Sequence, residues 1–268
     1  MEVPAPVLAA ALEANGIAWW QQFVAAVPQA EWHESADILY FATGVTFPWL
    51  NGVLRARLME SCLDAAIAET IGYFRARHLP MVWHVGPSTQ PASLGRELQA
   101  YGLYPSRAMP GMAIDLLALP EDSPAPPELT IQEARDAGAL AAWQSVFTAV
   151  FRTSEAAQPV IAEAFARMRD THPAQRYFCG YWQGKPVACS SLFCGAGVAG
   201  LYNVGVLPEA RGQGFGTALT LAPLRAACAD GYRVGALSST ESGYGLYRRL
   251  GFQECATFES YLLEDAEA

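Results

Sequence analysis

The chain has 268 residues, of which 52% are hydrophobic and 16% are charged, and its formal net charge is −9. This composition supplies a sizeable apolar core and excludes disorder for most of the chain. No run of Lys or Arg offers a surface for a phosphate backbone, so we expect no nucleic-acid partner. No stretch of 18 apolar residues and no basic, signal-like N-terminus occurs, so we expect a cytoplasmic protein without a membrane span.

The six cysteines do not predict a metal centre. None forms a C-x-x-C pair, and no histidine lies at zinc-ligand spacing from them. In such an apolar chain they are expected to be buried free thiols. We therefore expect no metal cofactor.

A segment rich in proline divides the chain. Residues 119–128 contain four prolines and three acidic residues, a composition that excludes a helix or a central strand. The flanking parts, 1–118 and 129–268, both have ordinary domain sizes. The sequence therefore predicts two domains joined by a linker at 119–128.

Hydrophobic patterning predicts alternating strands and helices. Before the linker, a helix is expected at 58–77 and a strand at 81–85. After it, strands are expected at 129–132, 177–182, 187–193, 198–207, 234–238, 252–254 and 257–263, with helices at 138–151, 159–170, 215–230 and 243–250. Gly184 marks a hairpin turn between the second and third of these strands. This order is typical of the α/β class with a mixed sheet.

The most informative segment joins the strand at 198–207 to the helix at 215–230. Residues 202–219 read YNVGVLPEARGQGFGTAL, so that Gly212, Gly214 and Gly216 alternate around the start of the helix. Glycine permits positive φ and lets a ligand approach the backbone closely. The first N–H groups of a helix lack partners, and with the helix dipole and Arg211 they form a site for an anion such as pyrophosphate.

Two common nucleotide-binding motifs do not fit this loop. A Walker loop needs a lysine that is absent here, and the third glycine of a G-x-G-x-x-G motif would fall on Thr217. A tight strand–helix turn without a ligand remains the alternative. Pro223, inside the following helix, predicts a kink or an early helix end near Leu219, beyond the anion site.

Two motifs together resemble those of the GNAT superfamily of acetyltransferases. The pattern V-x-V-x-P followed by R-x-x-G-x-G, in residues 204–216, resembles the family's acyl-CoA pyrophosphate loop. Residues 246–252, LYRRLGF, are similar to its late L-Y-x-x-L-G-F segment. The two motifs follow each other in the family's order, and the resemblance covers about residues 129–263.

The resemblance implies acetyl-CoA as co-substrate and a set of residues that hold it. Backbone groups of Val204, Gly205 and Val206 would bind the pantetheine arm, because this strand splays from its neighbour in the family. The loop would bind the pyrophosphate through Arg211, Gly212, Gln213, Gly214, Phe215, Gly216 and Thr217. Thr240 stands where many members carry Asn or Ser; its hydroxyl would reach CoA or would cap the next helix.

Tyr247 is the catalytic residue that the resemblance implies. It matches the family's tyrosine near the CoA sulfur and would protonate the departing thiolate as a general acid. A core aromatic on a short helix is the alternative. For the general base the chain departs from the family, because many members carry a carboxylate on the strand before the loop, where residues 201–204 of this chain read LYNV. The candidates are Glu155, Glu241, or a water held by Tyr202 or Asn203.

The two halves of the chain resemble each other. Aligning Gly102 with Gly251 places Leu98 on Tyr247 and the strand at 81–85 on the strand at 234–238. Residues 44–48 echo residues 205–208, so that 47–55 would replace the glycine loop and lack its anion site. This self-similarity predicts a tandem duplication. Five of the seven tryptophans lie in the first half and either pack the core and the domain interface or wall an acceptor pocket: Trp19, Trp20, Trp32, Trp49 and Trp83.

Together these observations predict two GNAT-like domains, each a mixed, mostly antiparallel sheet flanked by helices, of which the first is degenerate. The expected activity is direct transfer of an acetyl group from acetyl-CoA to the amine of a small molecule or peptide. A homodimer is compatible with this expectation. The alternative is a non-catalytic acyl-CoA sensor that regulates a partner.

Overall fold

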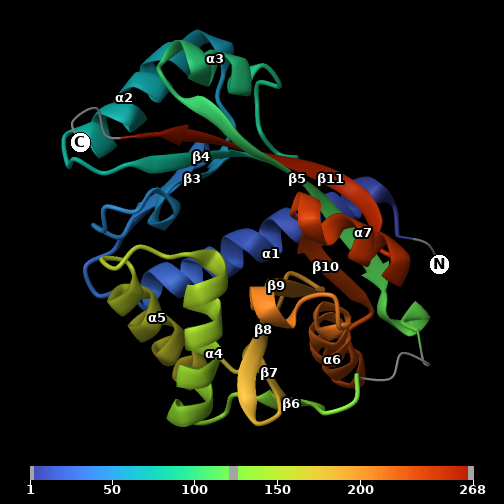
Figure 1. Cartoon of the computed structure of the whole chain (residues 1–268). Coiled ribbons are helices and arrows are strands. Elements are labelled where there is room, and N and C mark those ends of the chain that lie inside the picture. The colour runs from blue at the N-terminus through green and yellow to red at the C-terminus, as the bar shows by residue number, and fades with distance from the viewer. Residues whose placement is uncertain (1–2, 121–125, 265–268) are drawn as a thin grey trace.

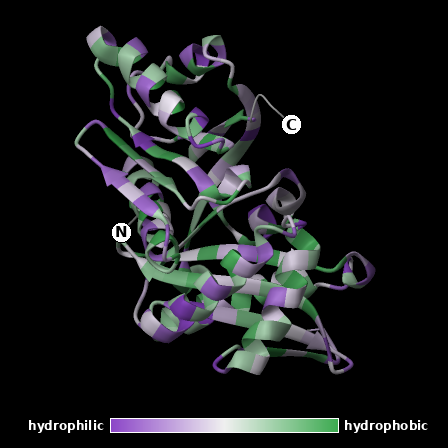
Figure 2. Cartoon of the chain, turned by 90° about the vertical axis from the view of Figure 1, so that its left-hand side faces the viewer, coloured by the Kyte–Doolittle hydropathy of each residue, from purple (hydrophilic) through white to green (hydrophobic). Residues whose placement is uncertain are grey.

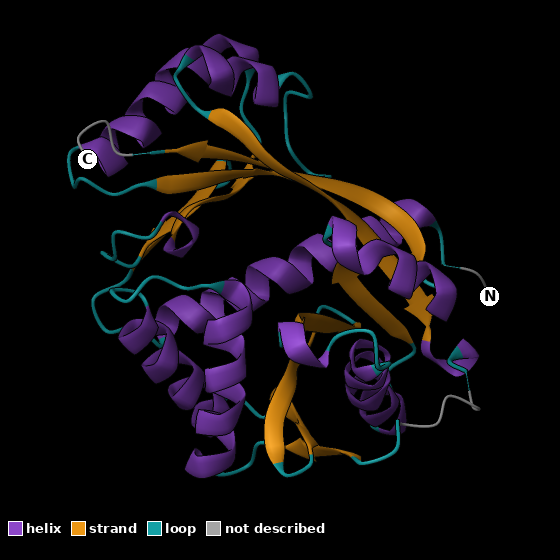
Figure 3. Cartoon of the chain, in the orientation of Figure 1, coloured by secondary structure: helices purple, strands orange, loops and turns teal. Residues whose placement is uncertain are grey.

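The computed structural model describes residues 3–120 and 126–264. The described residues form one eleven-stranded sheet with helices packed against it (Figures 1 and 3). The strand order is β1-β2-β3-β4-β11-β5-β10-β9-β8-β7-β6. The predicted mixed sheet flanked by helices is confirmed, but both halves contribute to one sheet instead of forming one sheet each.

The N-terminal half starts with the longest helix of the described chain. Its helices and strands are α1 (Ala5–Ala25), β1 (Glu31–Glu34), β2 (Ile38–Ala42), β3 (Asn51–Ala56), α2 (Leu63–Arg75), β4 (Met81–Val85), α3 (Leu94–Ala100) and β5 (Tyr104–Asp115). Short 3₁₀ turns lie at Pro48–Leu50, Glu60–Cys62 and Leu116–Ala118. The strand predicted at 81–85 is confirmed, whereas β1, β2 and β3 had no predicted counterpart.

The C-terminal half follows the predicted order of elements. They are β6 (Leu129–Glu133), α4 (Ala137–Phe151), α5 (Gln158–Thr171), β7 (Gln175–Trp182), β8 (Lys185–Gly195), β9 (Val198–Val206), a 3₁₀ turn (Pro208–Ala210), α6 (Phe215–Ala229), β10 (Val234–Ser238), α7 (Glu241–Leu250) and β11 (Gln253–Leu263). The predicted hairpin is present, since Gln183 and Gly184 have φ of 50° and 75° between paired residues Trp182 and Lys185.

Two local predictions were wrong: the early helix end near Leu219 and the division of the last strand. Helix α6 does not end near Leu219 but continues through Pro223 to Ala229. Pro223 and its neighbour Leu224 are buried in the core, and this packing opposes the helix-breaking effect of the ring. The strands expected at 252–254 and 257–263 are one strand, β11, whose register with β5 shifts between Glu254 and Ala256. A β-bulge, not a turn, accounts for the break in the pattern.

The last strands of the two halves are exchanged. Strand β11 pairs antiparallel with β4 of the N-terminal half, and β5 pairs antiparallel with β10 of the C-terminal half. Strands β5 and β11 also pair with each other along most of their length, at the centre of the sheet. The two halves therefore share their hydrogen bonds, so neither half forms its sheet alone. The predicted boundaries at 118 and 129 stay a prediction, and residues 121–125 of the predicted linker lie outside the described residues.

The halves repeat one arrangement of elements. In each, two parallel strands flank a helix in sequence, β3-α2-β4 and β9-α6-β10, and each parallel pair has two register positions. This repetition supports a duplication, but it changes which residues correspond to each other in the middle of the two halves. The counterpart of β9 is β3, so the counterpart of the glycine loop is residues 57–62, not 47–55. Glu60 and Asp64 lie there at the start of α2, where their negative charge opposes anion binding.

Helix α1 crosses the middle of the molecule and connects the halves (Figure 1). It packs against α5, β8, β9 and β11. Asn15, 1% exposed, places its Nδ2 2.9–3.5 Å from the carbonyl oxygens of Phe193, Gly195 and Val198. Its Oδ1 accepts a 2.6 Å hydrogen bond from the Tyr202 hydroxyl. Helices and strands both carry hydrophobic residues (Figure 2), and Leu12, Trp19 and Phe23 of α1 are buried, so α1 is held on the sheet by both apolar packing and this polar anchor.

Candidate active site

The site begins where β9 separates from β10. The two parallel strands pair only at Ala199–Gly235 and Gly200–Ala236. Asn203 has φ of 55°, and the register between β8 and β9 shifts across this residue. Asparagine tolerates this left-handed conformation better than most residues. The resulting bulge turns β9 away from β10 and opens a gap beside residues 201–204.

The glycine loop connects the end of β9 to the start of α6. Gly212 and Gly214 have φ of 77° and 82°, as the alternation of glycines predicted, and Gly214 is the residue before the first turn of α6. Within the described residues, the backbone N–H groups of residues 212–217 have no hydrogen-bond acceptor. The Nε–H of Arg211 donates to the Val206 carbonyl at 3.2 Å, which places the guanidinium beside the loop. Unpaired donors, a helix N-terminus and a cation together suit an anion.

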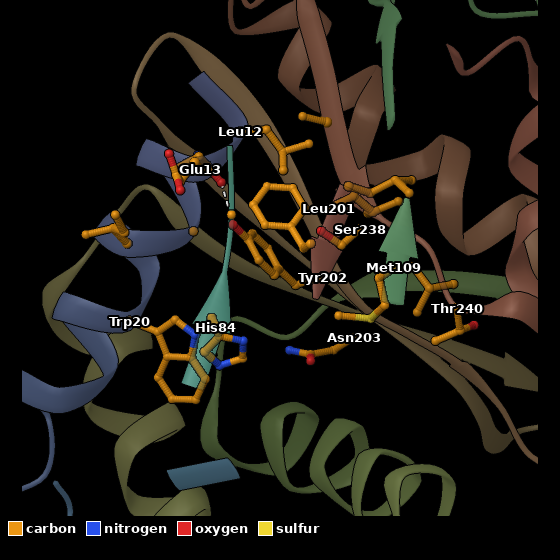
Figure 4. Close-up of a pocket in the computed structure, with 18 of the residues that line it drawn as sticks. Leu12, Glu13, Trp20, His84, Met109, Leu201, Tyr202, Asn203, Ser238 and Thr240 are labelled. Carbon is orange, nitrogen blue, oxygen red and sulfur yellow. Dashed lines mark hydrogen bonds between the residues drawn. The ribbon is translucent and has the colours of Figure 1, made fainter. Parts of the chain in front are cut away.

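A cavity of about 310 Å³ occupies the gap between β9 and β10 (Figure 4). Its C-terminal wall includes Leu201, Tyr202, Asn203, Val204, Ala236, Leu237, Ser238, Thr240 and Tyr247. Its N-terminal wall includes Leu12, Glu13, Gly16, Ile17 and Trp20 of α1, together with His84, Met109 and Leu54. The cavity is therefore assembled from both halves of the chain, and most of its lining is apolar.

Tyr247 and Thr240 reach the cavity from the segment that contains α7. Tyr247 is 9% exposed and packs edge-on against Phe252. Burial raises the pKa of the Tyr247 phenol to about 12, and a hydrogen bond with Thr220 opposes this effect. Thr240 holds the position before the first turn of α7 but makes no capping hydrogen bond; its Oγ1 lies 3.1 Å from Ser242 Oγ. Both residues therefore line the cavity next to the β9 strand.

The candidate bases from the sequence do not gather at the cavity. Glu155 lies exposed between α4 and α5, and Glu241 is exposed at the start of α7; neither lines the cavity. Tyr202 does line it, but its hydroxyl donates to Asn15, and burial raises its pKa far above the usual range. Asn203 lines the cavity with its amide, whose Nδ2 donates to Ser191 Oγ at 3.0 Å.

Two ionisable residues of the N-terminal half were missed. Glu13 on α1 and His84 on β4 both line the cavity (Figure 4). Burial lowers the pKa of His84 to about 4, and its Nδ1 lies 3.2 Å from Ser260 Oγ.

Of the tryptophans, Trp20 lines the cavity and Trp19 stacks on Tyr202, whereas Trp83 is fully buried in the core. The sequence offered one signal for the α1 wall of the cavity, since Glu13, Gly16, Ile17 and Trp20 share one face of a helix.

The described residues contain no group of three or more His, Cys, Asp or Glu side chains arranged to hold a metal ion. Within residues 3–120 and 126–264, no helix is both long and apolar enough to cross a membrane.

Comparison with known proteins finds a family match within the site-bearing half. The Acetyltransferase (GNAT) domain family matches residues 173–254, a range that includes β9, the glycine loop and α7. This part of the chain is therefore similar to a GNAT acetyltransferase domain. Among curated proteins, no sequence matches the chain significantly.

Solved structures extend the GNAT fold to both halves. The chain is similar to a GCN5-related N-acetyltransferase from Kribbella flavida, with a TM-score of 0.71 and 19% identity over 95% of this chain and 96% of that one. A GCN5-related N-acetyltransferase from Sphaerobacter thermophilus has a TM-score of 0.65 and 16% identity over 98% and 94%. A tandem GNAT protein from the clavulanic acid biosynthesis pathway has a TM-score of 0.62 and 16% identity over 96% of each chain. At sequence identities of 16–19%, these structural similarities establish the fold alone.

Proposed function

We propose that the protein transfers an acetyl group from acetyl-CoA to an amine. The observation that carries this proposal is the conjunction of unpaired N–H groups at residues 212–217, the splayed strand β9 and a buried Tyr247 on one side of a cavity. GNAT domains transfer acetyl groups, and these three features supply an anion site, an open strand edge and a proton donor.

The residues present fit acetyl-CoA. The loop N–H groups and Arg211 would hold the pyrophosphate at the N-terminus of α6. Beyond Gly200, the edge of β9 that faces β10 is unpaired, so backbone groups of Val204 and Val206 would hold the pantetheine arm. Thr240 would contact the bound molecule through its hydroxyl. Acetyl-CoA, when bound, supplies a thioester whose C–S bond breaks as the C–N bond to the amine forms.

Tyr247 would act on the departing sulfur. With a pKa of about 12, its phenol keeps its proton throughout the physiological pH range and can donate it to the thiolate. An acyl-CoA sensor, the alternative function, needs no proton donor in the cavity. The position of Tyr247 therefore supports transfer over sensing.

The test is release of free thiol from acetyl-CoA with a panel of primary amines, with mass spectrometry of the acetylated product. The proposal predicts thiol and acetylated amine in equal amounts. Tyr247→Phe should lower turnover by roughly 100-fold and leave the Kd for acetyl-CoA nearly unchanged. Tyr244→Phe is the matched control, because its phenol bonds to Glu254 outside the cavity lining. Acetyl-CoA binding without transfer to any amine of the panel would favour the sensor.

A further inference from the structure

The α1 wall of the cavity contains a carboxylate without a counter-charge. Glu13 is 9% exposed, and its Oε1 accepts a hydrogen bond from the Ser88 backbone N–H at 3.3 Å. No Lys, Arg or His side chain among the described residues forms an ion pair with it. Buried carboxylates are usually paired, because desolvation of an isolated charge is costly. A cation held in the cavity would supply the missing partner.

The surroundings of Glu13 limit the shape and polarity of such a cation. Gly16, one turn further along α1, leaves open space: a Cβ there would meet no atom within 4 Å. Ile17 and Trp20 continue the same helix face along the cavity, and Met109 and Phe258 are further apolar lining residues. Glu13 is the one carboxylate among the described residues that line the cavity. A single negative charge in an apolar cavity matches one positive charge on an apolar body.

We propose that Glu13 binds the acceptor and that the acceptor is a compact monoamine with an apolar or aromatic body, seated over Gly16. This inference rests on the proposed function, since it names the substrate class of the same site. It assigns acceptor recognition to the N-terminal half, whose own loop lacks the glycines and carries Glu60 and Asp64 at the start of α2. A polyamine would leave a second charge unpaired, and an amino sugar would carry several hydroxyls into a lining that is mostly apolar.

The first experiment measures binding by titration calorimetry with and without CoA. The probes are phenethylamine, its neutral analogue 2-phenylethanol, spermidine and glucosamine. The proposal predicts that phenethylamine binds at least tenfold more tightly than each of the other three. Glu13→Gln keeps the shape of the side chain and should abolish the preference for the amine over the alcohol. Glu69→Gln, an exposed residue on α2, is the control and should change nothing.

A second variant tests where the apolar body of the amine binds, independently of its charge. Gly16→Leu should fill the open space and weaken phenethylamine binding at least tenfold without changing the Kd for CoA. Gly72→Leu is the matched control, because Gly72 also lies inside a helix where an added Cβ would meet no atom within 4 Å, but it is exposed on α2. Both leucines replace a helix-interior glycine, so both variants should fold at least as stably as the wild type.

The outcomes separate this inference from the proposed function. Absence of CoA binding would contradict acetyl-CoA use, yet the comparison of amine with alcohol would still test Glu13. Equal binding of phenethylamine and 2-phenylethanol, or an unchanged preference in Glu13→Gln, would overturn the role of Glu13. Tighter binding of spermidine or glucosamine would overturn the proposed substrate class. Unchanged phenethylamine binding in Gly16→Leu would overturn the proposed position of the apolar body over Gly16.

Discussion

Single residues with unusual environments shape this site. Asn203, with φ of 55°, bends β9 at the point where the cavity opens, and Gly212 and Gly214 turn the chain into α6. His84 is a different case, because it is half-buried beside the cavity and the one hydrogen-bond partner of its Nδ1 within the described residues is the Ser260 hydroxyl. Its burial has a consequence for stability that can be measured without knowing the substrate.

The stability of the protein should fall as the pH drops from about 6.5 to about 4. An unfolded histidine takes up a proton near pH 6.5, whereas burial lowers the pKa of His84 to about 4 in the folded protein. Between these values the unfolded state binds more protons, so protonation favours unfolding. His84→Gln should reduce the loss of unfolding free energy between pH 7 and pH 4 by about 1–3 kcal/mol.

Urea titrations at several pH values measure this loss, and the difference between the wild type and the variant isolates His84 from the carboxylates. His78→Gln, at an exposed position, should retain the full wild-type slope. Identical slopes in the wild type and in His84→Gln would contradict a His84 that stays neutral in the folded protein.

At the scale of residues, the sequence predicted what is local. Positive φ at Gly212 and Gly214 follows from glycine alternating at a strand–helix turn. The place of Tyr247 at the cavity agrees with a match to a family motif. Glu13 and His84 could not be found in this way, because the cavity joins α1, β4 and β9, which are distant in sequence. Nothing in the residues around Glu13 indicates that it lacks a counter-charge.

At the scale of elements, α1 holds the two walls of the cavity together. Asn15 bonds to carbonyl oxygens of the β8–β9 hairpin and to Tyr202, while two residues before it Glu13 contacts the segment after β4. Asn15→Ala would leave these buried groups without partners. The expected loss is about 2–4 kcal/mol of unfolding free energy, with weaker amine binding.

Urea unfolding of Asn15→Ala measures this loss, and Gln21→Ala, at an exposed position of the same helix, is the control. A loss below about 0.5 kcal/mol, the range of ordinary surface substitutions, would show that apolar packing alone holds α1.

Elements with strong local patterns were predictable. Strands β4 and β10 have the predicted bounds because each is a short apolar run between turns. Helix α6 was predicted to kink or to end early near Leu219, but it continues to Ala229, because burial of its apolar face outweighs the effect of one missing hydrogen bond. Strand β3 was missed because its counterpart β9 was aligned with residues further upstream. That error also placed the lost anion site in residues 47–55 instead of 57–62.

At the scale of the whole molecule, exchange of β5 and β11 makes the halves interdependent. Without β5, strands β10 and β11 of the C-terminal half would both expose unpaired edges at the centre of the sheet. The fragment 126–268 should therefore fail to unfold cooperatively and fail to bind acetyl-CoA, although it contains the complete GNAT motif region. Co-expression with fragment 1–125 should restore both properties.

Circular dichroism during urea titration and calorimetry with acetyl-CoA measure these two properties. A fragment 126–268 that unfolds cooperatively and binds acetyl-CoA as the full chain does would contradict the interdependence. The exchange itself could not be predicted from the sequence, because pairing between strands so distant along the chain leaves no local pattern. The repeat of α3-β5 and α7-β11 only indicated that the two ends are equivalent.

The central claim is that the loop before α6 binds the pyrophosphate of acetyl-CoA, and one matched pair of variants tests it. Gly212 and Gly231 both have positive φ, of 77° and 97°, and a Cβ at either would meet no atom within 4 Å. Alanine at either position therefore introduces similar backbone strain, of about 1–2 kcal/mol. Gly212 lies in the loop, whereas Gly231 lies beyond the opposite end of α6.

Titration calorimetry with acetyl-CoA is the decisive measurement. The account predicts that Gly212→Ala binds acetyl-CoA at least tenfold more weakly than the wild type and that Gly231→Ala binds it with an unchanged Kd. Equal affinities for all three proteins, or no binding by the wild type, would contradict it.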